Sequence, residues 1–136
     1  MFLSAVMRSQ QNTKEYIDRH LDICAKIKKP LVMEEFGYPR DGFMFATGTP
    51  TKGRDGFYEY VFKLVGDNAE KGGYFAGCNF WGWGGYAQPK HEEQWQVGDD
   101  YTGDPAQEAQ GLNSVFASDS STLSVVKEQA ERMGKI

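Results

Sequence analysis

Two adjacent glutamates, Glu34 and Glu35, lie at the end of a short apolar run and are well suited to do chemistry. The run has no polar alternation, which is typical of a strand buried on both faces: Leu31, Val32 and Met33. Neighbouring strand residues point to opposite faces, so in a closed sheet one carboxylate would face the interior and the other the surrounding helices. An ionised carboxylate there could attack an anomeric carbon as a nucleophile. The alternative is that both carboxylates lie at a solvated strand end.

Aromatic and small residues gather around a second apolar run further along the chain. Residues 72–86 hold six glycines and six aromatic residues. Glycine lets another backbone or a ligand approach closely, and a flat ring packs against the apolar C–H face of a sugar. Trp81 and Trp83 are therefore candidate sugar-binding residues. The alternative is that one or both belong to the core, because aromatic residues at alternate strand positions often do.

The stretch from Gly82 to about Ser118 shows no periodic pattern, and such long irregular stretches are usually functional or flexible. His91 and Trp95 lie in it as further candidate substrate-binding residues, against the alternative of a solvated charged loop. Four acidic residues could supply oxygen ligands to calcium, but their order does not match an EF-hand, so we expect a solvated turn and no metal site: Asp99, Asp100, Asp104 and Glu108. The sequence also has no glycine-rich dinucleotide pattern and no nucleophile-elbow serine, and we expect no cofactor.

Length and composition favour a single globular domain over residues 1–136, with 40% hydrophobic and 25% charged residues. The net charge of −4 argues against a nucleic-acid partner. The sequence has no apolar run near the roughly 20 residues that span a bilayer, and no basic segment precedes the apolar stretch at residues 1–7 to make a secretory signal. Two cysteines, Cys24 and Cys78, exclude a disulfide-dense scaffold and are expected as buried free thiols.

The elements that must position these residues alternate between helix and strand. Apolar spacing predicts a helix from Asn12 or Thr13 to about residue 28, a strand after Pro30, and a helix over about 51–70 that ends before a Lys-Gly-Gly turn. A second strand over 74–81 and a last helix over about 122–133 follow. This alternation indicates a parallel α/β architecture, in which chemistry lies at the carboxyl ends of the strands. Both the glutamate pair and the tryptophans fall at those ends.

The stretch Lys29-Pro-Leu-Val-Met-Glu-Glu-Phe-Gly37 resembles the seventh-strand motif of glycoside hydrolase family 5, and its endo-β-1,4-mannanase branch in particular. Asn79-Phe-Trp-Gly-Trp83 resembles the eighth-strand motif, and the segments around Arg54-Asp55 and from Tyr101 to Phe116 are also similar. The resemblance implies a (β/α)8 barrel with retaining chemistry. It assigns Glu35 as the nucleophile and Trp81 as the sugar-stacking residue, while Glu34 would point toward the helices.

The same resemblance exposes a departure from the family pattern. A TIM barrel needs about 250 residues, whereas this chain has 136. The family's acid/base glutamate in an Asn-Glu motif and its His-x-Tyr motif have no counterpart in this sequence. We therefore expect the C-terminal part of a TIM barrel, the last two strands with their helices, as a fragment of a glycoside hydrolase catalytic domain.

The expected function follows from this assignment. The parent protein would cleave β-1,4-mannosidic bonds in β-mannan or a related polysaccharide, with the isolated chain inactive or nearly so. The competing reading is a non-catalytic carbohydrate-binding or interaction fragment that uses Trp81, Trp83 and Trp95. Unpaired sheet edges would favour self-association. The resemblance suggests export, secreted or periplasmic, and the chain itself assigns no compartment.

Overall fold

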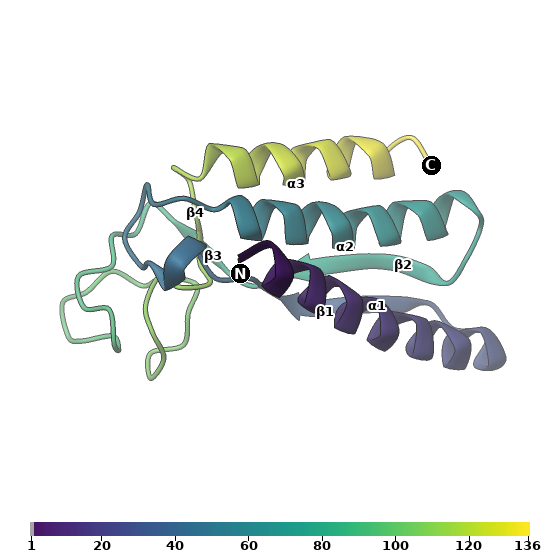
Figure 1. Cartoon of the computed structure of the whole chain (residues 1–136), viewed down its shortest axis with the longest axis horizontal. Coiled ribbons are helices and arrows are strands. Elements are labelled where there is room, and N and C mark those ends of the chain that lie inside the picture. The colour runs from purple at the N-terminus through teal and green to yellow at the C-terminus, as the bar shows by residue number, and fades with distance from the viewer. Residues whose placement is uncertain (1) are drawn as a thin grey trace.

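The computed structural model of the chain describes residues 2–136. Its elements follow the order α1 (Phe2–Ile27), β1 (Leu31–Phe36), the short 3-10 helix η1 (Asp41–Phe43), α2 (Lys52–Glu70), β2 (Phe75–Phe80), β3 (Trp83–Gly85), β4 (Val115–Phe116) and α3 (Ser120–Met133). The loops gather at one end of the molecule (Figure 1). None of the helices described here is both long enough and apolar enough to cross a membrane.

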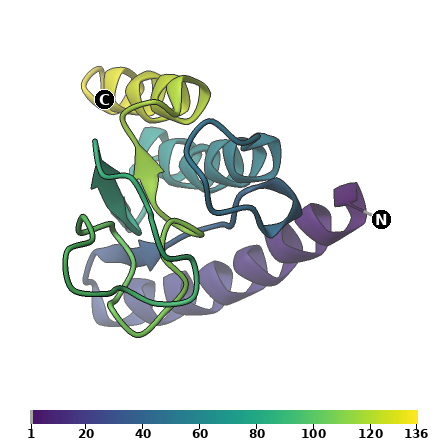
Figure 2. The same cartoon turned by 90° about the vertical axis from the view of Figure 1, so that its left-hand side faces the viewer.

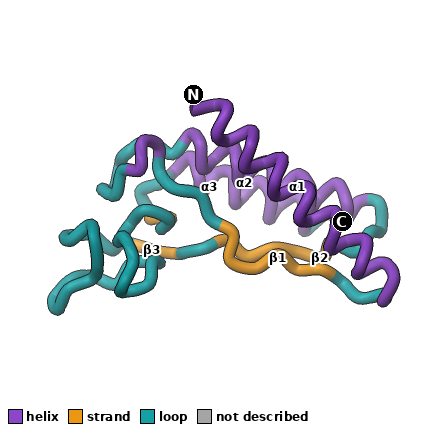
Figure 3. Tube along the Cα trace, turned by 60° about the horizontal axis from the view of Figure 1, so that its bottom comes forward, coloured by secondary structure: helices purple, strands orange, loops and turns teal. Residues whose placement is uncertain are grey.

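Strands β1 and β2 form a parallel pair joined through α2, which confirms the predicted βαβ alternation. Leu31 lies opposite Phe75 and Phe36 opposite Phe80, with a register irregularity between Met33 and Phe36. A second, much shorter parallel pair, β3 with β4, lies beyond the end of β2. Viewed from below, the strands form one layer and the helices another (Figure 3).

The core fills the space between this sheet and the helices. Phe36 from β1 packs edge-on against Tyr58 and Phe62 of α2, with ring centroids 5.0 and 5.8 Å apart. A second cluster joins Ile17 of α1 to Val65 and Phe75, all at most 2% exposed. Each fully buried apolar side chain of this size contributes about 1.5–3 kcal/mol. The packing that stabilises the fold therefore lies on the helix-facing side of the sheet. The opposite side contributes little to the core.

The first helix begins at Phe2, about ten residues before Asn12 and Thr13, which the sequence suggests as its N-cap. Tertiary contacts explain the difference. Val6 is 8% exposed, and the Gln10 side-chain amide donates to the Gly56 carbonyl at 3.0 Å. Packing against α2 thus stabilises the helix across Asn12 and Thr13, although side chains of these types favour the first position of a helix.

Candidate active site

The two glutamates of β1 both lie off the helix-packed face, because the strand contains a bulge. Met33 and Phe36 both pack into the helix-side core, and the register irregularity falls between them. Glu34 and Glu35 are both exposed, and Glu35 has φ 56°. Strict alternation would have placed one carboxylate on each face, and the family resemblance points Glu34 toward the helices. Both expectations are wrong, because Glu34 follows Met33 on the other face and the bulge inserts a residue into the alternation before Phe36.

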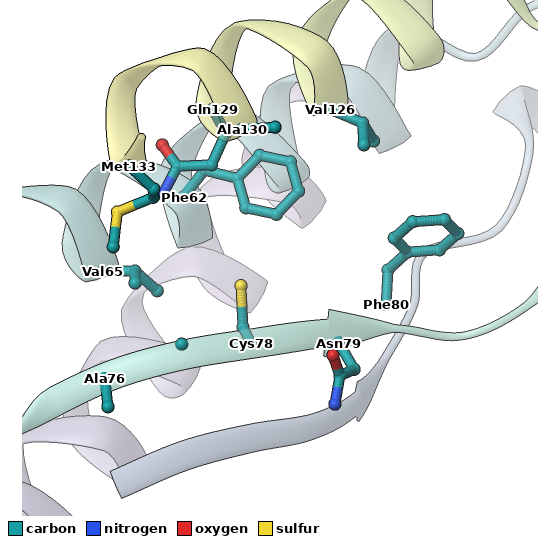
Figure 4. A pocket seen from close by; sticks show the side chains of 11 residues that line it. Phe62, Val65, Ala76, Cys78, Asn79, Phe80, Val126, Gln129, Ala130 and Met133 are labelled. Atoms are coloured by element: carbon teal, nitrogen blue, oxygen red, sulfur yellow. The ribbon is translucent and has the colours of Figure 1, made fainter. Parts of the chain in front are cut away.

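A cross-strand hydrogen bond fixes the side of the sheet on which Glu34 lies. The Asn79 side-chain amide donates to Glu34 Oε2 at 2.7 Å. Figure 4 shows Asn79 pointing away from the helices, while Cys78 and Phe80 of the same strand point toward them. Glu34 therefore shares the open face of the sheet with Asn79. The groove in Figure 4, about 460 Å³ and largely apolar, lies on the other side, between β2 and the α2–α3 pair.

Trp81 lies beside the carboxyl end of β1, next to the glutamates. Its backbone N–H donates to the Phe36 carbonyl at 2.7 Å, and its carbonyl accepts from the Tyr58 hydroxyl at 3.3 Å. Gly37 passes so close that an added Cβ would lie 2.9 Å from the Trp81 carbonyl oxygen. The Trp81–Gly82 peptide bond is cis. Sequence order alone separates Glu35 and Trp81 widely, and the parallel pairing brings their two strand ends together.

Trp83 is 54% exposed and begins β3, opposite Val115 of β4. The core alternative for this residue is therefore wrong. Trp81 is half-buried, so its exposure does not decide between a core residue and a sugar-binding residue. Gly82, between them, is buried against Gly103, which returns the long loop to the end of β2. Figure 2 shows that loop in front of the strand ends.

His91 and Trp95 lie in this loop and share a partner there. His91 Nδ1 lies 2.9 Å from Asp99 Oδ2, and Trp95 Nε1 donates to the Asp99 carbonyl at 3.2 Å. Burial opposes ionisation of Asp99, but hydrogen bonds from His91 and from the Gln96 backbone lower the pKa of Asp99 overall. The Trp95 ring stacks on Tyr101, with centroids 5.3 Å apart and an interplanar angle of 5°. The loop is thus an ordered unit with its own polar centre.

The acidic residues of the loop do not all form the solvated turn that their sequence suggests. Asp104 is only 7% exposed. Its carboxylate accepts from the Gly111 backbone at 2.7 Å and from the Ser114 hydroxyl at 2.6 Å. Buried polar groups need such partners, and here they hold the loop together. Within the described residues, no group of three or more His, Cys, Asp or Glu side chains is placed to hold a metal ion.

Two buried arginines hold the loops that surround the strand ends, and sequence reasoning missed their role. Arg54, fully buried on α2, donates to the carbonyls of Tyr38, Ser114 and Leu112 at 2.8 Å each. Burial lowers the pKa of Arg54. Arg40 pairs with Asp119, the residue directly before α3. The only sequence signal for this role was Arg54 at the start of the second predicted helix. The family resemblance includes the Arg54-Asp55 segment but does not say what the arginine binds.

The two cysteines are free, as predicted, but both are half-buried rather than fully buried. Cys78 faces the groove between β2 and the helices (Figure 4), and burial raises the pKa of its thiol to about 11. At neutral pH this thiol is protonated and weakly nucleophilic. It therefore takes no part in the candidate site on the opposite face.

A parallel βαβ unit with carboxylates at one strand end and a tryptophan at the next is the arrangement expected of part of a (β/α)8-barrel enzyme. The family model described as "GH family 5 beta-mannosidase-like" matches residues 3–136, so the chain belongs to glycoside hydrolase family 5. Solved family 5 mannosidases are covered only to about a third of their length, which confirms the prediction of a partial barrel.

Curated relatives and solved structures agree with this assignment. The chain is 26% identical over 129 residues to mannan endo-1,4-beta-mannosidase 3 of Arabidopsis thaliana, covering 90% of this chain and 25% of the relative. It superposes on a family 5 mannosidase mutant from Rhizomucor miehei in complex with mannosyl-fructose, with a TM-score of 0.84 and 26% identity. That match covers 96% of this chain and 32% of the solved one. The chain thus spans about a quarter to a third of the length of these relatives.

Proposed function

We propose that this chain contributes the nucleophile and a sugar-stacking residue to a retaining glycoside hydrolase that cleaves β-1,4-mannosidic bonds in mannan. Glu35 is the nucleophile and Trp81 is the stacking residue. The curated relative is named a mannan endo-1,4-beta-mannosidase, which supports the substrate class. Trp83, Trp95 and His91 are further substrate contacts in the proposal.

The backbone of Glu35 is the observation that carries the nucleophile assignment. A residue with a Cβ at φ 56° is strained, and glycine is the usual occupant of such a position. Strained residues of this kind cluster at functional sites, where the surrounding structure holds a side chain in a required direction. Here the bulge directs a carboxylate to the strand end that Trp81 adjoins.

The chemistry needs a second carboxyl group. In a retaining mechanism one carboxylate attacks the anomeric carbon, and a carboxylic acid about 5–5.5 Å away protonates the leaving oxygen. Glu34 is adjacent but already accepts a hydrogen bond from Asn79. The proposal therefore assigns the proton donor to the part of the barrel that the relatives have beyond the matched region. On this basis the 136-residue chain alone releases no reducing sugar from mannan.

A sugar with a good leaving group tests the nucleophile alone, because its reaction does not need the missing acid. 2-Deoxy-2-fluoro-β-mannosyl fluoride needs no proton donor, because fluoride leaves with the electron pair of its C1–F bond as a carboxylate oxygen bonds to C1. We expect intact-protein mass spectrometry to show one added fluorosugar, and peptide mapping to locate it on Glu35. Glu35→Gln removes the adduct, and the matched control Glu34→Gln keeps it.

Two results would contradict the assignment. An adduct on Glu34 that survives Glu35→Gln would move the nucleophile to the neighbouring residue. Hydrolysis of mannan by the pure 136-residue chain, lost in Glu35→Gln, would show that the acid lies within it.

A further inference from the structure

We propose that Tyr101 is a second sugar-stacking platform, which takes one sugar unit of the same β-mannan chain; this rests on the proposed function. The sequence suggests Trp95 as the substrate-binding residue of this loop. In the structure, however, the exposed ring of the stacked pair is that of Tyr101. Tyr101 is 79% exposed, whereas Trp95 is half-buried. Trp95 supports the platform from behind.

The stacked geometry is that of a supported ring. The two rings are nearly parallel, at 5° and 5.3 Å between centroids. Trp95 is held on its own side, because its indole N–H donates to the Asp99 carbonyl and its backbone N–H donates to the Ala106 carbonyl at 2.9 Å. A ring whose orientation is already fixed loses little conformational freedom when a ligand packs on it.

The base of this unit is also ordered. The Asp99 carboxylate lies 2.9 Å from both His91 Nδ1 and the Gln96 backbone nitrogen. Lys90 reaches the Gly98 carbonyl at 3.0 Å across the same turn. Hydrogen bonds from several points of the loop therefore converge on the segment that carries the stacked rings, as a built binding surface requires.

The platform lies beside the candidate active site and not on a remote surface. Gly103, two residues after Tyr101, packs on Gly82, where an added Cβ on either glycine would lie 2.6–2.8 Å from the other's backbone. The Gly103 backbone also donates to Ser114 Oγ at 2.9 Å. Gly82 directly follows Trp81, so the loop fixes Tyr101 near the strand end that carries the first stacking residue.

The surroundings of the ring favour a sugar over an apolar partner. Tyr101 is flanked along the chain by Asp100 and Thr102, and the stack rests on the Asp99–His91 pair. A lone aromatic face among hydroxyl, carboxylate and imidazole groups suits a ligand with an apolar C–H face and a rim of hydroxyls. A protein partner would need a larger contiguous apolar patch.

Mannohexaose binding to the 136-residue chain, measured by isothermal titration calorimetry, tests the platform. Removing one stacked aromatic contact, as in Tyr101→Ala, should weaken binding about tenfold, while Tyr101→Phe, which keeps the ring, stays within about twofold. Trp95→Leu, which removes the support, should give an intermediate loss. Tyr86→Ala is the matched control, because Tyr86 is 90% exposed and has no ring contact among the described residues.

The outcomes separate this inference from the proposed function. Unchanged affinity in Tyr101→Ala with a loss in Trp81→Ala overturns the platform and leaves the active-site assignment intact. An equal loss in Tyr86→Ala overturns it as well, because any exposed tyrosine would then serve. If the wild-type chain binds no mannohexaose while the fluorosugar still labels Glu35, the platform alone is overturned. An unchanged amide NMR spectrum elsewhere in Tyr101→Ala confirms that the variant is folded.

Discussion

Glu35 shows how a single residue can be placed against its own conformational preference. Its neighbours Met33 and Phe36 are anchored in the helix-side core, and the strand has one residue too many between them. The extra residue takes φ 56°, which disfavours any side chain with a Cβ. At this proposed nucleophile, function and stability are therefore expected to oppose each other.

Replacing Glu35 by glycine should consequently stabilise the chain. Relief of the left-handed strain is expected to raise the free energy of unfolding by up to about 1 kcal/mol, after the entropy cost of glycine. Urea denaturation followed by circular dichroism measures the change. Glu34→Gly is the control, because Glu34 is not among the positive-φ residues, and glycine there should destabilise. Equal destabilisation by both substitutions would show that Glu35 carries no strain.

Helices α2 and α3 are joined by charged residues as well as by packing. Arg132 of α3 lies so close over Gly66 that an added Cβ there would clash with its guanidinium. The same guanidinium bonds Asp67 and Glu70 at 2.8 Å. Hydrogen bonds from Lys63 and Arg132 lower the pKa of Asp67 to about 2, and Arg132 lowers the pKa of Glu70.

This pairing predicts an acid-sensitive contribution to stability. The carboxyl pKa values are lower in the folded than in the unfolded chain, so the contribution is present above about pH 4 and lost as the pH falls toward about 2. The difference in melting temperature between wild type and Arg132→Met should therefore shrink over that window, and also in 1 M salt. Lys127→Met is the control, since Lys127 pairs with Glu131 at a longer 3.8 Å. A difference that stays constant with pH would assign the effect of Arg132 to packing alone.

At this scale the sequence predicted α2, α3, β1 and β2 closely, because the helical spacing of apolar residues and the short apolar runs of the strands both reflect burial. It missed the bulge, because a bulge leaves the residue types unchanged and alters only the alternation between Met33 and Phe36. It missed the arginine network, because Arg54 binds carbonyls of three distant segments, which no local spacing reveals. The strand ends were predicted as the site, whereas the partner of Trp95 became visible only in the folded loop.

For the molecule as a whole, the main liability is an unpaired edge on each strand of a two-stranded sheet. The edge of β1 adjoins a groove of about 340 Å³ that includes Tyr16, Ile17 and Val32, and Val32 is 45% exposed. The groove between β2 and α3 is apolar as well. We propose that copies of the chain associate through these edges, because edge pairing satisfies backbone groups and covers apolar surface together.

Light scattering coupled to size-exclusion chromatography tests the association. We expect the mass to rise with concentration for the wild type and to fall toward that of one chain in Val32→Lys, because a charge on the exposed edge opposes pairing. Val97→Lys is the control, since Val97 is 95% exposed but lies in the loop. A wild-type mass of one chain at every concentration, or equal effects of the two substitutions, would contradict this proposal.

The bulge also bears on how such a chain can evolve. Met33 and Phe36 support the packing, while Glu34 and Glu35 contribute nothing to the core. Drift at either carboxylate therefore leaves the molecule folded and its aromatic surface in place. Under the proposed function, a lineage that loses its nucleophile here is therefore expected to keep the fold, so that sequence divergence at these two positions records a change of role and not decay of the fold.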